Sequence, residues 1–250
     1  MGTVSLVVST RLRSRAQRSA AGKSAHTESE SFWRRNALGL TCFAVFGILV
    51  IGLVLTGHHA YNAEQEAMGS PRVSFVTYLG EGHFWEALFE NWESEFLQMA
   101  AYVILTVFLI QKGSSESKDP DTHEPVDDDP READLRSSGV PWPVRRGGIW
   151  LKLYENSLFI AFVLLFLASI VGHAFGGLDV FNDDLRQNGR PAVSVWGYVT
   201  SSEFWYESFQ NWQSEFLAVF AIIVLSIFLR QRGSPESKPV MAPDSSTGTS

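Results

Sequence analysis

The chain contains very little cysteine and none of the common catalytic motifs. Cys42 is the only cysteine among 250 residues, which excludes a disulfide framework and a cysteine-based metal site. The sequence has no nucleophile elbow, phosphate-binding glycine loop or dinucleotide fingerprint, and it lacks the HExxH pattern of zinc peptidases. We therefore expect no catalytic residues, no bound cofactor, no metal and no enzyme activity.

Charged residues are missing from two long apolar segments. Hydrophobic residues make up 45% of the chain and aromatic residues 13%, and they are concentrated in blocks, as in membrane proteins. Ala37 to Gly57 and Ser157 to Gly177 each provide about 20 residues without a formal charge, the length that crosses a hydrocarbon core of ~30 Å. Both segments are predicted transmembrane helices.

Two further apolar segments, 96–110 and 216–229, are shorter. Alone, about 15 residues do not distinguish a buried core helix from a spanning one. If the helices begin near Phe84 and Phe204, each reaches about 27 residues, or ~40 Å. Gly113 and Gly233 are typical helix-end signals. The predicted fold class is an all-α membrane protein with four transmembrane helices.

Basic residues are scarce in the two loops between paired spans. Loops 58–83 and 178–203 contain only Arg72, Arg186 and Arg190, whereas Lys or Arg flanks the other end of every span. Under the positive-inside rule, these loops lie outside, and the N-terminus, the C-terminus and the central linker are cytoplasmic. We expect a multi-pass protein whose first partner is the lipid bilayer. The basic N-terminal stretch lacks interleaved aromatics, so nucleic acid is not an expected partner.

The sequence repeats itself at an offset of 120 positions. "FENWESEFL" from Phe89 to Leu97 returns as "FQNWQSEFL" from Phe209 to Leu217, and the similarity extends without a gap on both sides. We interpret this as a parallel tandem repeat of a two-helix hairpin. The predicted divisions are a disordered basic tail (1–31), the first two-span repeat (32–118), an acidic Pro-rich linker (119–148), the second two-span repeat (149–238) and a disordered C-terminal tail (239–250).

The repeated phrase places polar residues on one face of a helix. Both copies keep the pattern Asn-x-x-Ser-Glu, whereas the acidic positions on a neighbouring face change: Glu86, Glu90 and Glu93 become Tyr206, Gln210 and Gln213. A carboxylate inside a membrane is costly unless it is paired, protonated or hydrated, so such residues are candidate functional sites. The candidate polar membrane cluster is Asn91, Ser94, Glu95, Asn211, Ser214 and Glu215.

Histidine and aspartate also suggest metal sites, but the spacing is unfavourable. His58, His59 and His83 share the first outer loop with three Glu residues, a set that suits zinc, and the second copy has no equivalent. The run Asp127 to Asp129 lacks the spacing and the glycine of a calcium loop. His173 lies near the outer end of the third span, where hydrogen bonding within the helix bundle is the expected role.

Two stretches carry a resemblance to a known family. They read "NWESEFLQMAAYVILTVFLIQKGSSESK" and "FWYESFQNWQSEFLAVFAIIVLSIFLRQRGSPESK". Here the chain resembles a bacterial family of duplicated four-span membrane proteins that bears only a domain-of-unknown-function label. The resemblance covers roughly residues 33 to 240. It implies a bacterial inner-membrane protein and brings no catalytic residues.

Three functional hypotheses follow. The first is a non-enzymatic structural or interaction protein that acts through lipid, self-association or another membrane protein, because no catalytic constellation is present. The alternative is a small cation or proton channel or carrier that uses Glu95 and Glu215. The third is a metal-dependent membrane enzyme built on His83 with His58 or His59. In the structural hypothesis, the two glutamates bond to neighbouring groups and lock the bundle.

Overall fold

The structure, a computed structural model, describes residues 32–248. Within this range the regular secondary structure is helical and contains no strand, which confirms the predicted all-α class. The predicted disordered tail over 1–31 lies outside the described residues. The chain divides into two units, one ending at Ala60 and one beginning at Tyr61.

The first unit contains the short helix α2 (Phe32–Arg35) and most of α3 (Ala37–Ala67). Helix α3 begins at the predicted residue but continues well past Gly57. The added stretch, "HHAYNAEQEA", has no Gly or Pro that would stop a helix. The helix ends just before Gly69, whose φ of 74° fits the left-handed residue that closes many helices.

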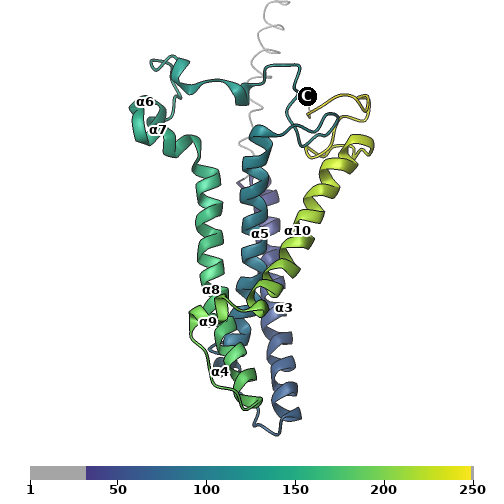
Figure 1. Cartoon of the computed structure of the whole chain (residues 1–250). Coiled ribbons are helices and arrows are strands. Elements are labelled where there is room, and N and C mark those ends of the chain that lie inside the picture. Colours follow the sequence, from purple (N-terminus) through teal and green to yellow (C-terminus); the bar gives the residue numbers. More distant parts are fainter. Residues whose placement is uncertain (1–31, 249–250) are drawn as a thin grey trace, which may run out of the picture. The chain divides into compact units, whose positions relative to one another are not determined.

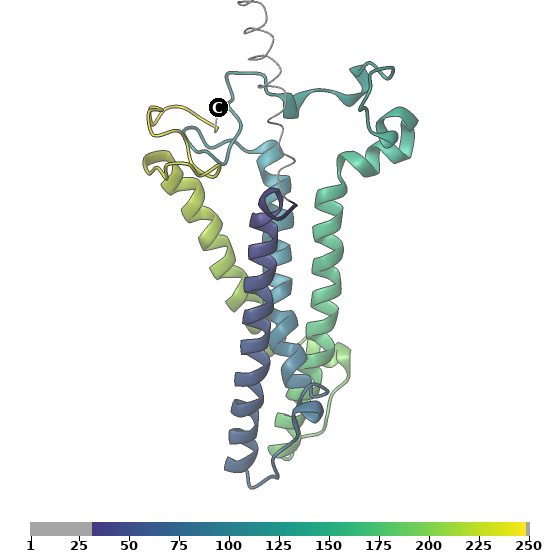
Figure 2. The ribbon, with the colours of Figure 1, turned by 180° about the vertical axis from the view of Figure 1, so that it is seen from behind.

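The second unit is built around three long helices. They are α5 (Gly82–Phe108), α8 (Ser157–Gln187) and α10 (Ser202–Phe228). Helix α5 is central, because it packs against both of the others and more extensively against α8 (Figures 1 and 2). The short helices α4 (Phe75–Tyr78) and α9 (Val195–Val199) precede α5 and α10.

The linker between α5 and α8 contains only short helices. These are the 3-10 turns η1 (Pro125–Asp127) and η2 (Pro130–Glu132), and the α-helices α6 (Trp142–Arg146) and α7 (Gly148–Glu155). A run of acidic residues and prolines cannot form a long amphipathic helix, which fits this irregular path.

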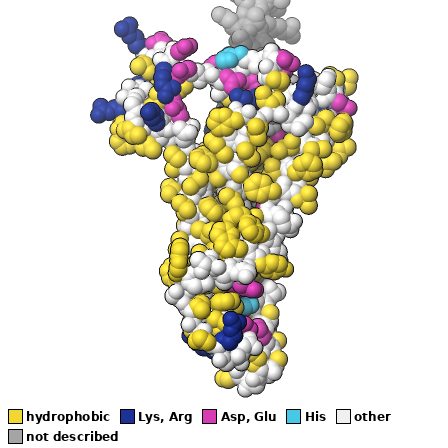
Figure 3. Space-filling model, viewed as in Figure 1, with side chains coloured by type: hydrophobic (Ala, Val, Ile, Leu, Met, Phe, Trp, Pro, Cys, Tyr) yellow, Lys and Arg dark blue, Asp and Glu magenta, His cyan; other side chains and the backbone are white. Residues whose placement is uncertain are grey.

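Three of the described helices are long and apolar enough to cross a membrane: α3, α8 and α10. Figure 3 shows hydrophobic side chains over the middle of the visible helices, with most charged groups toward their ends. These features are compatible with a membrane protein. Helix α5 is less apolar than α10. It carries Gln98 and Tyr102 where α10 has Ala218 and Ile222, and it contains more acidic residues.

Equivalent turns connect the helices of each half. Asn62 donates its side-chain amide to the Val73 carbonyl and accepts from the Val73 amide, and Asn182 makes the same pair of bonds with Val193. These hydrogen bonds connect each loop to the last turns of the preceding long helix, α3 or α8. Ser201 caps α10 by accepting from the backbone of the first turn.

The C-terminal ends of α5 and α10 come earlier than the predicted stops at Gly113 and Gly233. The helices end at Phe108 and Phe228, and both glycines lie in the following turn with φ values of 89° and 85°. Their positive φ serves a tight turn rather than a helix cap. Each turn is stabilised by a serine hydroxyl that accepts from a backbone amide, Ser117 from Gln111 in the first turn.

The C-terminal segment, which the sequence predicts as a disordered tail over 239–250, makes several hydrogen bonds in its described part. The Lys238 ammonium, 1% exposed, donates to the carbonyls of Asp244 and Ser246. The Thr247 hydroxyl accepts from the Gly113 amide at 3.0 Å. This segment therefore links the end of α10 to the turn after α5.

Glycines on α8 allow α5 to approach its backbone closely. A β-carbon on Gly176 would lie 2.6 Å from the Glu86 amide nitrogen, and one on Gly172 would lie 2.4 Å from the Phe89 ring. On α5, a β-carbon on Gly82 would lie 2.6 Å from the Gly176 carbonyl. Small residues at such crossings are the usual means by which membrane helices pack tightly.

The tight α5 to α8 crossing predicts that Gly176→Ala destabilises the protein. The added methyl collides with backbone that cannot move without separating the helices, so the free energy of unfolding should fall by about 1–3 kcal/mol. Thermal unfolding of the purified protein in detergent measures the change. Ala168→Leu, on an exposed position of the same helix, is the control and should have little effect; equal effects of the two variants would contradict the packing argument.

Candidate functional site

The structure brings a histidine and two glutamates together at the centre of the second unit. His173 on α8 is fully buried. Its Nδ1 lies 3.1 Å from Glu93 Oε2 on α5, and its Nε2 lies 3.3 Å from Glu207 Oε2 on α10. One imidazole thus joins all three long helices. A ring with both nitrogens against carboxylates is best satisfied as an imidazolium, which donates at both positions.

Glu93 is held by several donors. Its carboxylate is 0% exposed, and Oε1 accepts from the Ser208 hydroxyl at 2.8 Å and from the Trp212 indole at 3.2 Å. Together with His173, three donors point at one carboxyl group. A carboxyl group can accept at both of its oxygens, so Glu93 accommodates all three contacts at once.

A tyrosine contacts the same oxygen of Glu207 as His173 does. The Tyr198 hydroxyl on α9 donates to Glu207 Oε2 at 2.7 Å. Burial raises the pKa of the Tyr198 phenol, and the hydrogen bond to Glu207 raises it further. Tyr198 therefore keeps its proton and acts as a donor. The Phe204 ring stacks on the His173 ring with centroids 4.8 Å apart, which covers one face of the imidazole.

Two more acidic residues of α5 complete the group. Glu90 accepts from the Asn211 side-chain amide of α10. Glu86 is half-buried and interacts electrostatically with Glu207 and with His173. We call the set Glu86, Glu90, Glu93, His173, Tyr198 and Glu207 the Glu–His cluster.

A third glycine of α8 makes room for the cluster. A β-carbon on Gly177 would lie 2.2 Å from the Tyr198 hydroxyl and 2.9 Å from Glu86 Oε1. Because Gly177 has no side chain, the Tyr198 hydroxyl and the Glu86 carboxyl group can both lie against α8 at this position. The local packing and the polar chemistry of the site thus depend on the same glycine.

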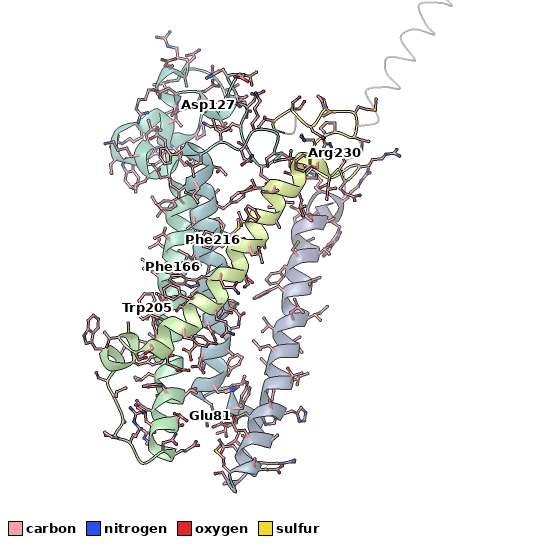
Figure 4. The ribbon with its side chains drawn as sticks, turned by 45° about the vertical axis from the view of Figure 1, so that its right-hand side comes forward. Glu81, Asp127, Phe166, Trp205, Phe216 and Arg230 are labelled. Carbon is pink, nitrogen blue, oxygen red and sulfur yellow. The ribbon has the colours of Figure 1, made fainter. Side chains whose placement is uncertain are left out.

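An acidic cavity of about 490 Å³ adjoins the Glu–His cluster. Glu86 belongs to both, so it connects the cavity with the buried residues. Several wall residues are exposed, so the cavity opens to the surface, and Arg186 is its only Lys or Arg. The acidic wall residues are Glu64, Glu81, Glu86, Asp179, Asp183 and Asp184; Figure 4 labels Glu81, near the start of α5.

The first three predicted cluster residues are neighbours on α5 but differ in burial. Ser94 is buried and donates its hydroxyl to the Asn91 carbonyl at 2.7 Å. Asn91 is exposed and donates to the Ala87 carbonyl of its own helix. Glu95 is exposed and interacts electrostatically with Glu215. These residues therefore do not form one shared pocket.

Among the other three predicted residues, Asn211 is hydrogen-bonded to Glu90 of the Glu–His cluster. Ser214 is exposed and donates to the Asn211 carbonyl at 2.8 Å. Glu215 is partly buried, and its backbone carbonyl accepts from the Gln98 amide at 3.4 Å. None of the six predicted residues is thus a member of the Glu–His cluster, although Asn211 is hydrogen-bonded to it.

The residues that the sequence analysis did not combine are those that differ between the copies. Glu93 corresponds to Gln213, His173 to Leu53 and Glu207 to Ala87. The predicted site residues recur at the 120-residue offset, whereas Glu93, His173 and Glu207 do not. A signal was present, since an apolar residue of one copy is replaced by His or Glu at two aligned positions. The expectation that His173 bonds within the bundle is confirmed.

The structure also bears on the metal hypothesis. Across residues 32–248, no group of three or more His, Cys, Asp and Glu side chains is arranged to hold a metal ion. His83 instead lies beside the rings of Tyr61 and Tyr78, with centroid separations of 5.6 and 6.3 Å. It forms part of the wall of the acidic cavity.

A family model described as a domain of unknown function, DUF6766, matches residues 29–249. Because the match covers most of the chain, the protein belongs to this family. No match was found among curated proteins or among solved structures.

The charge arrangement predicts that His173→Ala strongly destabilises the protein. Removal of the imidazole leaves Glu93 and Glu207 without their shared cation, and breaking such a buried pair costs about 3–5 kcal/mol. Thermal or denaturant unfolding in detergent measures the loss. Glu95→Gln, on the exposed face of α5, is the matched control and should behave like the wild type. Adding Glu93→Gln to His173→Ala should recover part of the stability, because it removes one unpaired charge; no recovery would contradict the ion-pair assignment.

Proposed function

We propose that this member of the DUF6766 family is a non-enzymatic, multi-pass membrane protein that carries protons across the membrane and takes them up from the side of its outer loops through the Glu–His cluster. The observation that carries the proposal is the burial of His173 between Glu93 and Glu207. Buried acid and base groups at hydrogen-bond distance are the parts from which intramembrane proton relays are made.

Charge balance supports proton binding. If Glu86, Glu90, Glu93 and Glu207 were all ionised, a single imidazolium would leave excess negative charge where little water is present. Such an excess is relieved by protons or by a bound cation. Glu93 is already engaged by His173, Ser208 and Trp212. Glu86 and its neighbour Glu90 are therefore the groups that hold the exchangeable protons. Glu86 faces the open cavity, which supplies the route from water.

The surface charge of the cavity supports the same direction of uptake. Acidic walls raise the local concentration of cations and disfavour anions. From the cavity, a proton reaches Glu86 first and then meets Glu207, which interacts with it electrostatically. Glu207 is hydrogen-bonded to His173, which is bonded in turn to Glu93. This series of groups leads from the cavity to the centre of the helix bundle.

We further propose four spans, with α5 as the fourth membrane helix, in a bacterial inner membrane. Helices α5 and α10 each have 27 residues and helices α3 and α8 each have 31, with bounds at the same sequence offset in both pairs. This equivalence supports a duplicated two-helix unit. Because each two-helix repeat crosses the membrane twice, both termini and the linker are cytoplasmic, as the distribution of Lys and Arg requires.

The second candidate function is the structural or interaction role, in which the cluster only locks the helices. The observation in its favour is that His173 connects three helices at once, so a purely stabilising role would use the same contacts. The partners would then be lipid, a second copy of the chain or another membrane protein. The two functions differ in whether protons cross a sealed membrane through the Glu–His cluster.

The four-span topology predicts where introduced cysteines are labelled. In a Cys42→Ala background, cysteines at Val76 and Trp196, which are both more than 70% exposed, should react with a membrane-impermeant maleimide added to intact cells. A cysteine at Val126 in the linker should react only after the membrane is opened. Labelling of Val76 and Trp196 on opposite sides would refute the parallel arrangement.

The proton-uptake proposal predicts a loss of flux when the cluster is altered. In sealed vesicles carrying the protein and a pH-sensitive dye, an imposed proton gradient should dissipate faster than in empty vesicles. His173→Gln and Glu86→Gln should each lower this rate by at least about tenfold, equivalent to about 1.4 kcal/mol in the rate-limiting step. Gln keeps a polar side chain at both positions, so folding is disturbed less than by Ala.

The matched control is the double variant Glu95→Gln with Glu215→Gln, which removes the two acids recurring in both copies. It should leave the flux unchanged if the Glu–His cluster is the site. Loss of flux in the double variant alone would instead identify Glu95 and Glu215 as the route. If the well-folded wild type produces no flux above empty vesicles while His173→Gln weakens helix association, the structural role stands.

A further inference from the structure

A second cavity, of about 400 Å³, lies between α5 and α10 toward their inner ends. This volume falls in the range of about 300–1,000 Å³ typical of small-molecule sites. Most of its wall is apolar, formed by Leu105, Leu109 and Ile110 with Phe216, Val219 and Ile223. The cavity is thus an apolar space within the part of the molecule that lies among lipid chains.

The cavity exists because α10 leans away from α5 toward the C-terminal end (Figures 1 and 4). The two helices meet near the Glu–His cluster, where Asn211 and Trp212 bond to acids of α5. At the far end the gap is bridged by polar contacts, since the Ser114 hydroxyl lies 2.9 Å from that of Ser226. With both ends fixed, the helices cannot close over the space between them.

The inner end of the cavity is polar and acidic. Gln111, Glu116 and Ser117 form its rim, and the Tyr102 hydroxyl donates to Glu116 at 2.5 Å. Glu116 is the only charged residue in the wall. The neighbouring Lys112 side chain is 67% exposed, and its ammonium lies 3.5 Å from the Asp121 carboxylate. A carboxylate at this rim attracts an ammonium group and repels a headgroup of net negative charge.

We propose that this cavity binds one phospholipid with a primary ammonium headgroup. An acyl chain lies along Leu105, Val219 and Ile223, the ammonium pairs with Glu116, and the phosphate lies toward Lys112. Lipid is the occupant that these features favour, because the apolar walls face the bilayer interior and the single charged group lies at the cytoplasmic rim. The bound lipid fills the space that would otherwise leave the inner halves of α5 and α10 unsupported.

Native mass spectrometry of the whole chain tests the proposal. The purified protein is equilibrated with equal amounts of phosphatidylethanolamine, phosphatidylglycerol and phosphatidylcholine, and the retained lipid is identified. One phosphatidylethanolamine per chain should be retained in preference to the others. Ile223→Trp, which fills the cavity, should lower retention by at least about tenfold. Leu217→Trp, at a 62% exposed position of the same helix, is the matched control and should leave it unchanged.

The headgroup assignment has its own variant. Glu116→Gln keeps the apolar walls, so the chain should still retain lipid but no longer prefer phosphatidylethanolamine to phosphatidylcholine. If Ile223→Trp does not fold, Val219→Phe adds less volume and should produce the same loss in weaker form. The proposal is overturned if the wild type retains no lipid, if phosphatidylglycerol is retained best, or if both cavity variants retain lipid like the control.

Discussion

The ion pairs of His173 with Glu93 and Glu207 are the interaction on which the second unit depends. They join α5, α8 and α10 at one buried point, and each partner is held by further donors from a neighbouring helix. Taking charges out of water is costly, so the arrangement persists only because every charge has a partner at hydrogen-bond distance. The positions of α5, α8 and α10 around His173 are therefore restricted to those that keep these hydrogen bonds.

The glycines of α8 supply the geometry that the ion pairs need. Gly176 lets the α5 backbone come close enough for its acids to reach the imidazole, and Gly177 leaves room for the Tyr198 hydroxyl. The close approach of α5 and α8 contrasts with the separation of α5 and α10 toward the C-terminal ends of these two helices, where the second cavity lies. One half of the unit is thus tightly packed around polar groups, and the other half is open and apolar.

Much of the fold follows from sequence pattern. The uncharged runs predicted the starts of α3 and α8, and the length of 27 residues predicted for the second helix of each half was correct. The helix ends were less predictable, because a helix continues through polar residues until a turn residue stops it, as beyond Gly57. The candidate site was largely missed: repetition drew attention to Glu95 and Glu215, whereas the acids that meet His173 are the buried Glu93 and the partly exposed Glu207, which do not recur at the 120-residue offset.

The sequence by itself determined that the chain is helical and apolar enough for a membrane, because hydrophobic run length and the spacing of turn residues act locally along the chain. Only the tertiary structure decided which acids meet the buried histidine. Residues 80 or more positions apart, such as Glu93 and His173, come together through the rotation and crossing of whole helices. The rotation and crossing of the helices depend on how glycines fit against a neighbouring backbone, and the sequence of a single helix does not specify this fit.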